Sequence, residues 1–314
     1  MNDNIKGILL IVLGMALFSF QDLFIKYLIE NISLLQILVF RGIIGSVCLI
    51  IFLKYRGKAV SFGTFYPLIA FTRAIFFFLG FLFFYLSLSA IKLAEATSLF
   101  FMSPLFMTIF SKLILKNEVG VYRILAIMIG FSGSLLIVKP NFQSLQWPML
   151  LPIFCAATYS LSMILAKISS DKDNVFQQSF HIYLSSFVLG LFTAIILVHS
   201  DINFGNEEIF NNLSKPWIFS GASLMGPLIM VSLLGSLGIL CLIMAYRIGS
   251  PILNSPSEYV LLIFSIASGY FVFSEIPDFM SFIGIGLIAT SGLLILFREQ
   301  IRNQPLAVNT NFRS

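Results

Sequence analysis

Residues 7–29 read GILLIVLGMALFSFQDLFIKYLI, a stretch in which Asp22 and Lys26 are the only charged side chains. An α-helix needs about 20 mostly apolar residues to cross the roughly 30 Å of hydrocarbon in a bilayer. The stretch therefore predicts a first transmembrane helix. It is longer than the apolar core of a secretory signal and has no clear small-residue cleavage site, so we interpret it as a retained helix.

Nine further apolar runs of similar length follow along the chain. Together the ten runs cover residues 7–29, 33–53, 67–89, 93–115, 121–139, 148–168, 176–198, 217–246, 251–273 and 279–297. Each run is continuously apolar and lacks the period-two alternation of a transmembrane strand. The predicted fold class is therefore an all-α integral membrane protein with ten transmembrane helices.

The composition excludes several function classes. Of the 314 residues, 58% are hydrophobic and only 11% are charged, and the mean hydropathy is +0.97. Soluble domains have about a quarter charged residues, so a soluble enzyme, a nucleic-acid-binding protein and a disordered scaffold are excluded. The three cysteines lie inside apolar runs, with no spacing typical of a metal site or a disulfide framework.

The basic residues predict an orientation in the membrane. With the N-terminus in the cytoplasm, ten spans place thirteen Lys and Arg residues on the inside and four on the outside. Cytoplasmic loops of membrane proteins carry such an excess of basic residues. We therefore expect both termini in the cytoplasm. The net charge of +5 then follows from topology and requires no nucleic-acid partner.

The two halves of the chain resemble each other. Ala16-Leu-Phe-Ser19 recurs as Ala157-Thr-Tyr-Ser160, and Lys26 recurs as Lys167 at the same shift. Because each half has five spans, an odd number, the second half must cross the membrane in the opposite direction. Inverted repeats are typical of secondary transporters, whose substrate site lies near the midplane. We expect a first repeat at 5–140, a second at 147–297 and a cytoplasmic tail at 298–314.

Several motifs carry a family resemblance that covers about residues 5–297. They include Phe84-Tyr-Leu-Ser-Leu-Ser-Ala90, Ser103-Pro-Leu-Phe106 and Ser257-Glu-Tyr-Val260. These stretches are similar to the EamA repeat of the drug/metabolite transporter superfamily. The resemblance implies two inverted five-helix repeats around a central cavity and a transporter in the bacterial inner membrane. It leaves the transported solute open.

Ionisable groups inside spans cost about 3 kcal/mol or more and are the first candidates for function. Glu258 lies within the ninth run, after Pro256 and next to Tyr259. Proline interrupts a helix, and a carboxylate at such a break is suited to binding a proton or a cation. The alternative is a carboxylate permanently paired with an arginine. Pro104 interrupts the fourth run at a corresponding place.

Two further groups have two interpretations each. Asp22 either forms an ion pair with Lys26, one helical turn away, or faces a central cavity and takes part in proton coupling. His181 either relays protons, since its side chain titrates near neutrality, or is an ordinary hydrogen-bonded histidine.

Arg41 and Arg73 lie inside the second and third spans and keep their charge. Pairing with Asp22 and Glu258 would line a cavity suited to a zwitterion such as an amino acid. The alternative for Arg73 is a role in helix packing alone. Tyr159, Ser160 and Tyr259 are expected to face the same central cavity. The candidate substrate-binding residues are Asp22, Arg41, Arg73, Tyr159, Ser160, Glu258 and Tyr259.

The sequence thus predicts a secondary active transporter of a small organic solute, an amino acid or related metabolite, by proton coupling or exchange. No Walker motif, cofactor motif or metal-ligand motif is present. An importer of S-adenosylmethionine or riboflavin is the alternative within the family. A channel, or an intramembrane serine protease built on Gly130-Phe-Ser-Gly133 and His181, are alternatives from other classes. The expected partners are the solute and the lipid bilayer, and homodimerisation stays open.

Overall fold

The computed structural model describes residues 3–57, 62–88, 90, 93–117, 119–138, 147–199, 213, 215–219, 222–273 and 278–302. Within these residues all regular secondary structure is helical, which confirms the all-α prediction for this part of the chain. The α-helices are α1 (Asp3–Asn31), α2 (Leu34–Tyr55), α3 (Pro67–Ser87), α4 (Leu93–Phe100), α5 (Ser103–Leu113), α6 (Val121–Val138), α7 (Leu150–Ile168), α8 (Val175–His199), α10 (Ala222–Ile248), α11 (Pro251–Asn254), α12 (Val260–Phe273) and α13 (Phe279–Arg302). The short 3-10 helices are η1 (Trp147–Met149), η2 (Ser169–Asp171) and η3 (Ser255–Tyr259).

Among the described residues, six helical segments are long and apolar enough to cross a bilayer. They are Asp3–Ile29, Leu34–Tyr55, Pro67–Ser87, Trp147–Asp171, Val175–Leu197 and Leu224–Ile248, and two shorter apolar helices are Val121–Ile137 and Phe279–Leu294. The predicted tail at 298–314 begins inside α13, which continues to Arg302. Its remainder, 303–314, lies outside the described residues.

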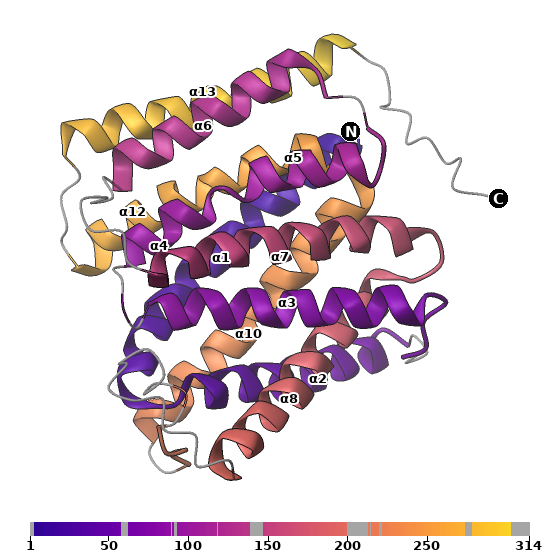
Figure 1. Ribbon diagram of the computed structural model, residues 1–314, viewed down its shortest axis with the longest axis vertical. Coiled ribbons are helices and arrows are strands. Elements are labelled where there is room, and N and C mark those ends of the chain that lie inside the picture. Colours follow the sequence, from indigo (N-terminus) through magenta and orange to yellow (C-terminus); the bar gives the residue numbers. More distant parts are fainter. Residues whose placement is uncertain are drawn as a thin grey trace.

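The helices pack in pairs formed between the two halves of the chain. Helix α1 packs along α10, α3 along α7, and α2 along α8. Helices α6 and α13 pack against each other along one edge of the bundle (Figure 1). The longest-range contacts therefore join the first half to the second, and the interior of the bundle lies between the halves.

The fourth and ninth apolar runs form interrupted helices. Helix α4 ends at Phe100 and α5 begins at Ser103, while α11 ends at Asn254 and η3 leads into α12. Each interruption coincides with a Ser-Pro pair, Ser103-Pro104 and Ser255-Pro256. Proline lacks the backbone N–H that would continue the helix, so a new helical segment starts with proline in its first turn. The two breaks meet, since α5 contacts both α11 and η3.

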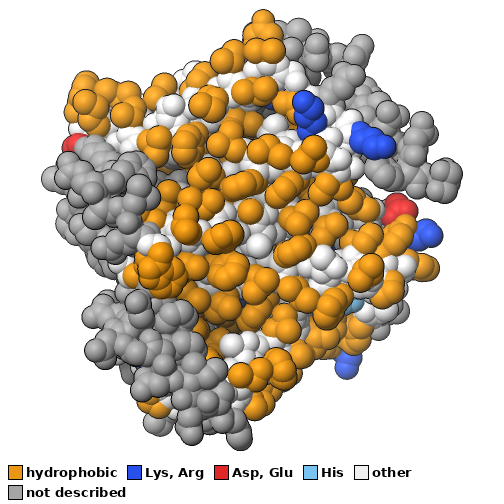
Figure 2. Space-filling view, in the orientation of Figure 1, with side chains coloured by type: hydrophobic (Ala, Val, Ile, Leu, Met, Phe, Trp, Pro, Cys, Tyr) orange, Lys and Arg blue, Asp and Glu red, His pale blue; other side chains and the backbone are white. Residues whose placement is uncertain are grey.

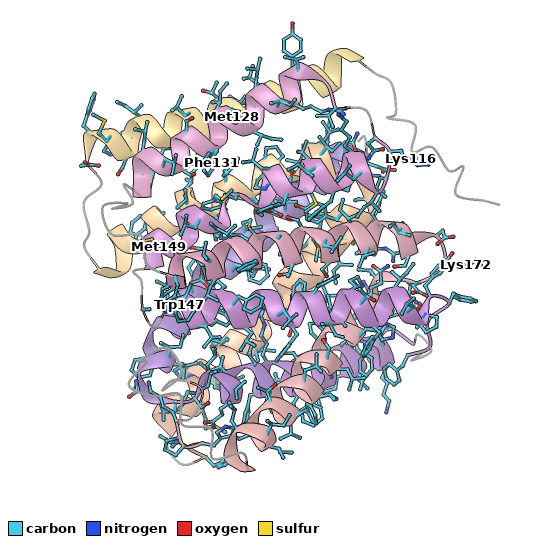
Figure 3. The ribbon with its side chains drawn as sticks, viewed as in Figure 1. Lys116, Met128, Phe131, Trp147, Met149 and Lys172 are labelled. Atoms are coloured by element: carbon cyan, nitrogen blue, oxygen red, sulfur yellow. The ribbon has the colours of Figure 1, made fainter. Side chains whose placement is uncertain are left out.

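The surface is apolar along the bundle and charged toward one end. Hydrophobic side chains cover most of the face in Figure 2, and the Lys and Arg side chains lie toward one side of it. Lys116 and Lys172 lie at this end, whereas Trp147 and Met149 lie at the opposite end (Figure 3). A large exposed apolar surface of this kind marks a protein that resides in a membrane.

Candidate functional site

Glu258 is the most completely enclosed carboxyl group of the described residues, with 0% of its surface exposed. The hydroxyl groups of Tyr159 and Tyr246 both donate to its Oε1, the first at 2.6 Å. The Ser103 hydroxyl donates to its Oε2 at 3.1 Å. We refer to these four residues, Glu258, Tyr159, Tyr246 and Ser103, as the Glu258 cluster.

The helix breaks bring the members of the Glu258 cluster together. Ser103 is the first residue of α5, so Glu258 lies at the N-terminal end of a helix, where negative charge is stabilised. Ser160 of α7 donates to the Ser103 carbonyl oxygen at 3.0 Å, which ties the break to α7. Thus Ser160 supports the cluster through Ser103, whereas Tyr159 from the preceding position contacts the carboxylate itself.

Tyr259, the next residue after Glu258, contacts the break between α4 and α5. Its hydroxyl lies 3.3 Å from the Phe101 carbonyl oxygen and 3.4 Å from that of Ile127. Carbonyls at the end of a helix lack intrahelical donors, and Phe101 follows the end of α4. Tyr259 therefore caps the break rather than joining the hydroxyl groups around Glu258.

Arg41 is the centre of a second polar cluster, and only 2% of its surface is exposed. Its Nη1 donates to the Tyr85 hydroxyl at 3.2 Å, and Gln21 Nε2 donates to the same oxygen at 3.3 Å. The guanidinium carbon lies 4.0 Å from the centre of the Phe81 ring. The half-buried Asp22 adjoins Gln21 and interacts electrostatically with Arg41 without forming an ion pair with it. We refer to Arg41, Gln21, Asp22 and Tyr85 as the Arg41 cluster.

Aromatic side chains fill the space between the two clusters. The Phe81 ring beside Arg41 lies 4.9 Å from Phe77, and Phe77 lies 6.3 Å from Tyr159 of the Glu258 cluster. A parallel row runs from Tyr85 through Phe84 and Phe100 to Tyr159. An aromatic path, with a cationic group at one end and a carboxyl group at the other, therefore crosses the interior.

The structure does not join the arginines to Glu258 as the pairing hypothesis required. Within the described residues neither Arg41 nor Arg73 forms a hydrogen bond or ion pair with that carboxylate. Arg73 is fully buried and donates through Nη2 to the Gln178 carbonyl oxygen at 2.6 Å. Ser162 donates to the Arg73 carbonyl oxygen at 3.0 Å. These contacts place Arg73 in the packing of α3 against α7 and α8.

His181 lies apart from the Glu258 cluster. Its Nε2 is 2.8 Å from the Phe62 carbonyl oxygen, in the segment that precedes α3. The ring also packs against Phe180. These contacts are those of a hydrogen-bonded structural histidine, and they do not include any member of either cluster.

Sequence reasoning missed Tyr246, Ser103, Tyr85 and Gln21. Each is an uncharged polar residue within an apolar run, which is a weaker signal than a charged residue in such a run. Ser103 also precedes Pro104, the helix break that the sequence did indicate. The two tyrosines were harder to select, because tyrosine rings are common in apolar helices. Only the hydrogen-bond partners of their hydroxyl groups distinguish site tyrosines from packing tyrosines.

Apolar helices of membrane-spanning length around two buried polar clusters are typical of a polytopic membrane protein. Residues 5–139 match the EamA-like transporter family. This confirms the resemblance carried by the Phe84–Ala90 and Ser103–Phe106 motifs. Members of the family are transporters rather than enzymes.

Similar proteins extend over almost the whole chain. An S-adenosylmethionine uptake transporter of Rickettsia bellii is 24% identical over 96% of this chain and 98% of its own length. A pseudopaline exporter of Pseudomonas aeruginosa is 24% identical over 91% of this chain and 94% of its own. An uncharacterized transporter of Helicobacter pylori is 26% identical over 94% of this chain and 95% of its own length.

A protein of known crystal structure has the same fold. It superposes with a TM-score of 0.76 over 95% of this chain and 99% of its own, at 14% identity. This likeness establishes the fold alone. The protease alternative loses its basis, since Ser132 is exposed on α6 and the relatives are transporters.

Proposed function

We propose that the protein is a ten-helix secondary transporter, built from two inverted repeats, that couples the movement of a small organic solute to protons at Glu258. The single observation that carries the proposal is the Glu258 cluster: a fully buried carboxyl group at the meeting point of two broken helices. Interrupted helices in corresponding positions of two repeats are the best structural pointer to a transport site.

The packing pattern supports the inverted repeat. In chain order, α1 to α3 correspond to α7, α8 and α10, and each half continues with a broken helix and a final helix. Exchanging the halves turns the α1–α10 contact into α7–α3, and both contacts are present. It likewise turns α1–α12 into α7–α5 and α2–α10 into α8–α3, and all of these are present. An approximate two-fold axis relating 5–140 to 147–297 accounts for this pattern.

The hydrogen-bond partners of Glu258 support proton binding. All three are hydroxyl groups, and a hydroxyl either donates or accepts. An ionised carboxylate accepts from all three, and a protonated carboxyl donates to one of them without rearranging the helices. Among the described residues, the titratable groups in hydrogen-bond contact with Glu258 are Tyr159 and Tyr246, and the neighbouring Tyr259 interacts with it electrostatically. An arginine partner would instead hold the carboxylate in its charged form.

The Arg41 cluster supports a zwitterionic solute, namely an amino acid or a related metabolite. It places a cation, an amide and the Asp22 carboxylate close together in the interior of the bundle. S-adenosylmethionine is the specific candidate, because it carries an α-amino and an α-carboxylate group and several relatives are named as its uptake transporters. The exporter among the relatives leaves both directions of transport open for this chain.

We place the protein in the bacterial inner membrane with both termini in the cytoplasm. The clustering of Lys116 and Lys172 at one end, opposite Trp147 (Figure 3), agrees with the excess of basic residues expected on the cytoplasmic side.

The test is uptake of labelled S-adenosylmethionine, and of the common L-amino acids, into liposomes that contain the purified protein. An inward proton gradient should accelerate uptake by the wild type. Glu258→Gln should abolish this acceleration while solute counterflow continues, and Asp3→Asn, an exposed carboxylate paired with Lys6, should behave as the wild type. Gradient-driven uptake that survives in Glu258→Gln would overturn the proposal, and single-channel current would favour a channel.

A further inference from the structure

We propose that Arg41 and Gln21 together bind the α-amino-acid head group of the substrate, at a site that Gly235 of α10 covers in this structure. The proposal rests on the proposed function, since it names the part of the substrate that this transporter recognises. It adds Gln21, Tyr85 and Gly235 to the residues that determine specificity.

The Arg41 guanidinium is held in place, but the N–H groups along one of its edges form no hydrogen bond with the described residues. Tyr85 engages Nη1, and the Phe81 ring supports the guanidinium plane. The Nε and Nη2 atoms are buried and have no hydrogen-bond partner among the described residues. These two N–H groups form one side of the guanidinium fork, and their spacing matches the two oxygens of a carboxylate.

Gln21 supplies the complementary acceptor. Its Nε2 is fixed by the Tyr85 hydroxyl, and its Oε1 is buried without a partner among the described residues. An α-ammonium group offers N–H donors to such an oxygen, and the neighbouring Asp22 carboxylate adds negative charge nearby. An inorganic anion would use the arginine fork but would leave the Gln21 acceptor unpaired. A donor pair and an acceptor side by side therefore favour an α-amino acid.

The three unpartnered atoms converge on one point of α10. A Cβ atom added to Gly235 would lie 2.8 Å from Arg41 Nε and 2.9 Å from Nη2, and closer still to Gln21 Oε1. Glycine is thus the residue that lets α10 close over these atoms. Buried donors and acceptors without partners destabilise a structure, so movement of α10 away from α2 would be favoured by a ligand that pairs them.

Pro227 gives α10 a place to bend. It lies within the helix, two turns before Gly235. Because proline removes one helical hydrogen bond, the segment that carries Gly235 has a natural point of flexure. We infer that the head group enters when this segment moves away from α2.

The experiment compares amino acids with their decarboxylated amines in binding to the full-length protein in detergent, by calorimetry. The pairs are S-adenosylmethionine and decarboxylated S-adenosylmethionine, arginine and agmatine, and phenylalanine and phenethylamine. At least one acid should bind about tenfold or more tightly than its amine, as expected for loss of a charge-assisted bidentate pair. Arg41→Lys should remove this preference, and Arg56→Lys, on the exposed end of the same helix, should retain it.

Gln21→Leu keeps the arginine and tests the acceptor separately, should Arg41→Lys fail to fold. It should weaken binding of the acid while the acid still binds more tightly than a partner lacking the carboxylate. The proposal is overturned if no acid binds to the folded wild type, if acids and amines bind equally, or if Arg41→Lys keeps the preference. The uptake assay separates this proposal from the proposed function. If proton-driven uptake is lost only in Glu258→Gln, the proposed function is supported even when the head-group site is overturned. If proton-driven uptake persists in Glu258→Gln, proton coupling at Glu258 is overturned while the binding data on the head-group site still hold.

Discussion

Lys167 and Arg247 cap the ends of each other's helices. The Lys167 ammonium, in the last turn of α7, donates to the carbonyl oxygens of Arg247 and Gly249 at the end of α10, the latter at 3.0 Å. The Arg247 guanidinium donates to the carbonyl oxygens of Ser170 and Asp173, which follow α7. Cations at helix C-termini satisfy the free carbonyls and complement the helix dipole. The exchange fastens α7 to α10 at one end of the bundle.

This exchange predicts strong coupling between the two cations. Lys167→Met and Arg247→Leu should each lower the melting temperature in detergent, because hydrogen bonds from charged groups contribute about 1.5–3 kcal/mol. The double variant should lose less than the two single losses combined, since each cation holds the same pair of helices. Strictly additive losses would show that the two contacts act independently.

The hydroxyl groups around Glu258 should matter for transport. Tyr159→Phe and Tyr246→Phe each remove one hydrogen bond to Oε1 and should slow proton-driven uptake by about tenfold or more. Tyr66→Phe is the matched control, because it removes a hydroxyl bound to the carboxylate of Asp171 away from the cluster. Uptake that is equally insensitive to all three changes would argue against a role for the cluster.

Gly235→Ala tests the cover over Arg41. The added methyl group would meet the buried side-chain ends of Arg41 and Gln21 rather than backbone, so the protein should fold with a melting temperature somewhat below that of the wild type, as expected for overpacking. Binding of the amino-acid ligand should fall by about tenfold, as expected when a well-placed ion-pair geometry is lost. Gly226→Ala, on the same helix with open space around it, is the control. Equal affinity in both variants would contradict the proposed site.

Substitutions at Gly130 and Ser132 test whether the Gly130-Phe-Ser-Gly133 motif serves helix packing or catalysis. A Cβ at Gly130 would lie 2.5 Å from Cε2 of the buried Tyr259 ring, so Gly130→Ala should destabilise the protein by about 1–3 kcal/mol through overpacking. Ser132 is exposed, and Ser132→Ala should leave both the melting temperature and transport unchanged. Loss of activity in Ser132→Ala with an intact fold would revive the protease alternative.

The helices were predictable because their signal is local. Apolar runs of membrane-spanning length indicated the helical segments, and Pro104 and Pro256 indicated where two of them break. Glu258 was selected because a carboxyl group in an apolar run is costly. Each of these inferences needs only a short stretch of sequence.

The partners of these residues were not predictable because they come from distant helices. Ser103 lies 155 positions from Glu258 and Tyr159 lies 99 positions away, and no spacing rule brings them together. The pairing of Arg41 with Tyr85 depends likewise on how α2 packs near α3. Charge alone suggested arginine–carboxylate pairs, but in the structure Glu258 accepts hydrogen bonds from hydroxyl groups and Arg73 donates one to a backbone carbonyl oxygen.

The most direct test of the central claim is the number of protons exchanged when the solute binds. Calorimetry of the ligand in two buffers of different ionisation enthalpy gives that number for the wild type, Glu258→Gln and Asp3→Asn. The account predicts a nonzero number in the wild type and Asp3→Asn, and none in Glu258→Gln while the ligand still binds. A wild type that binds the ligand without exchanging protons, or an unchanged number in Glu258→Gln, would contradict proton coupling at Glu258.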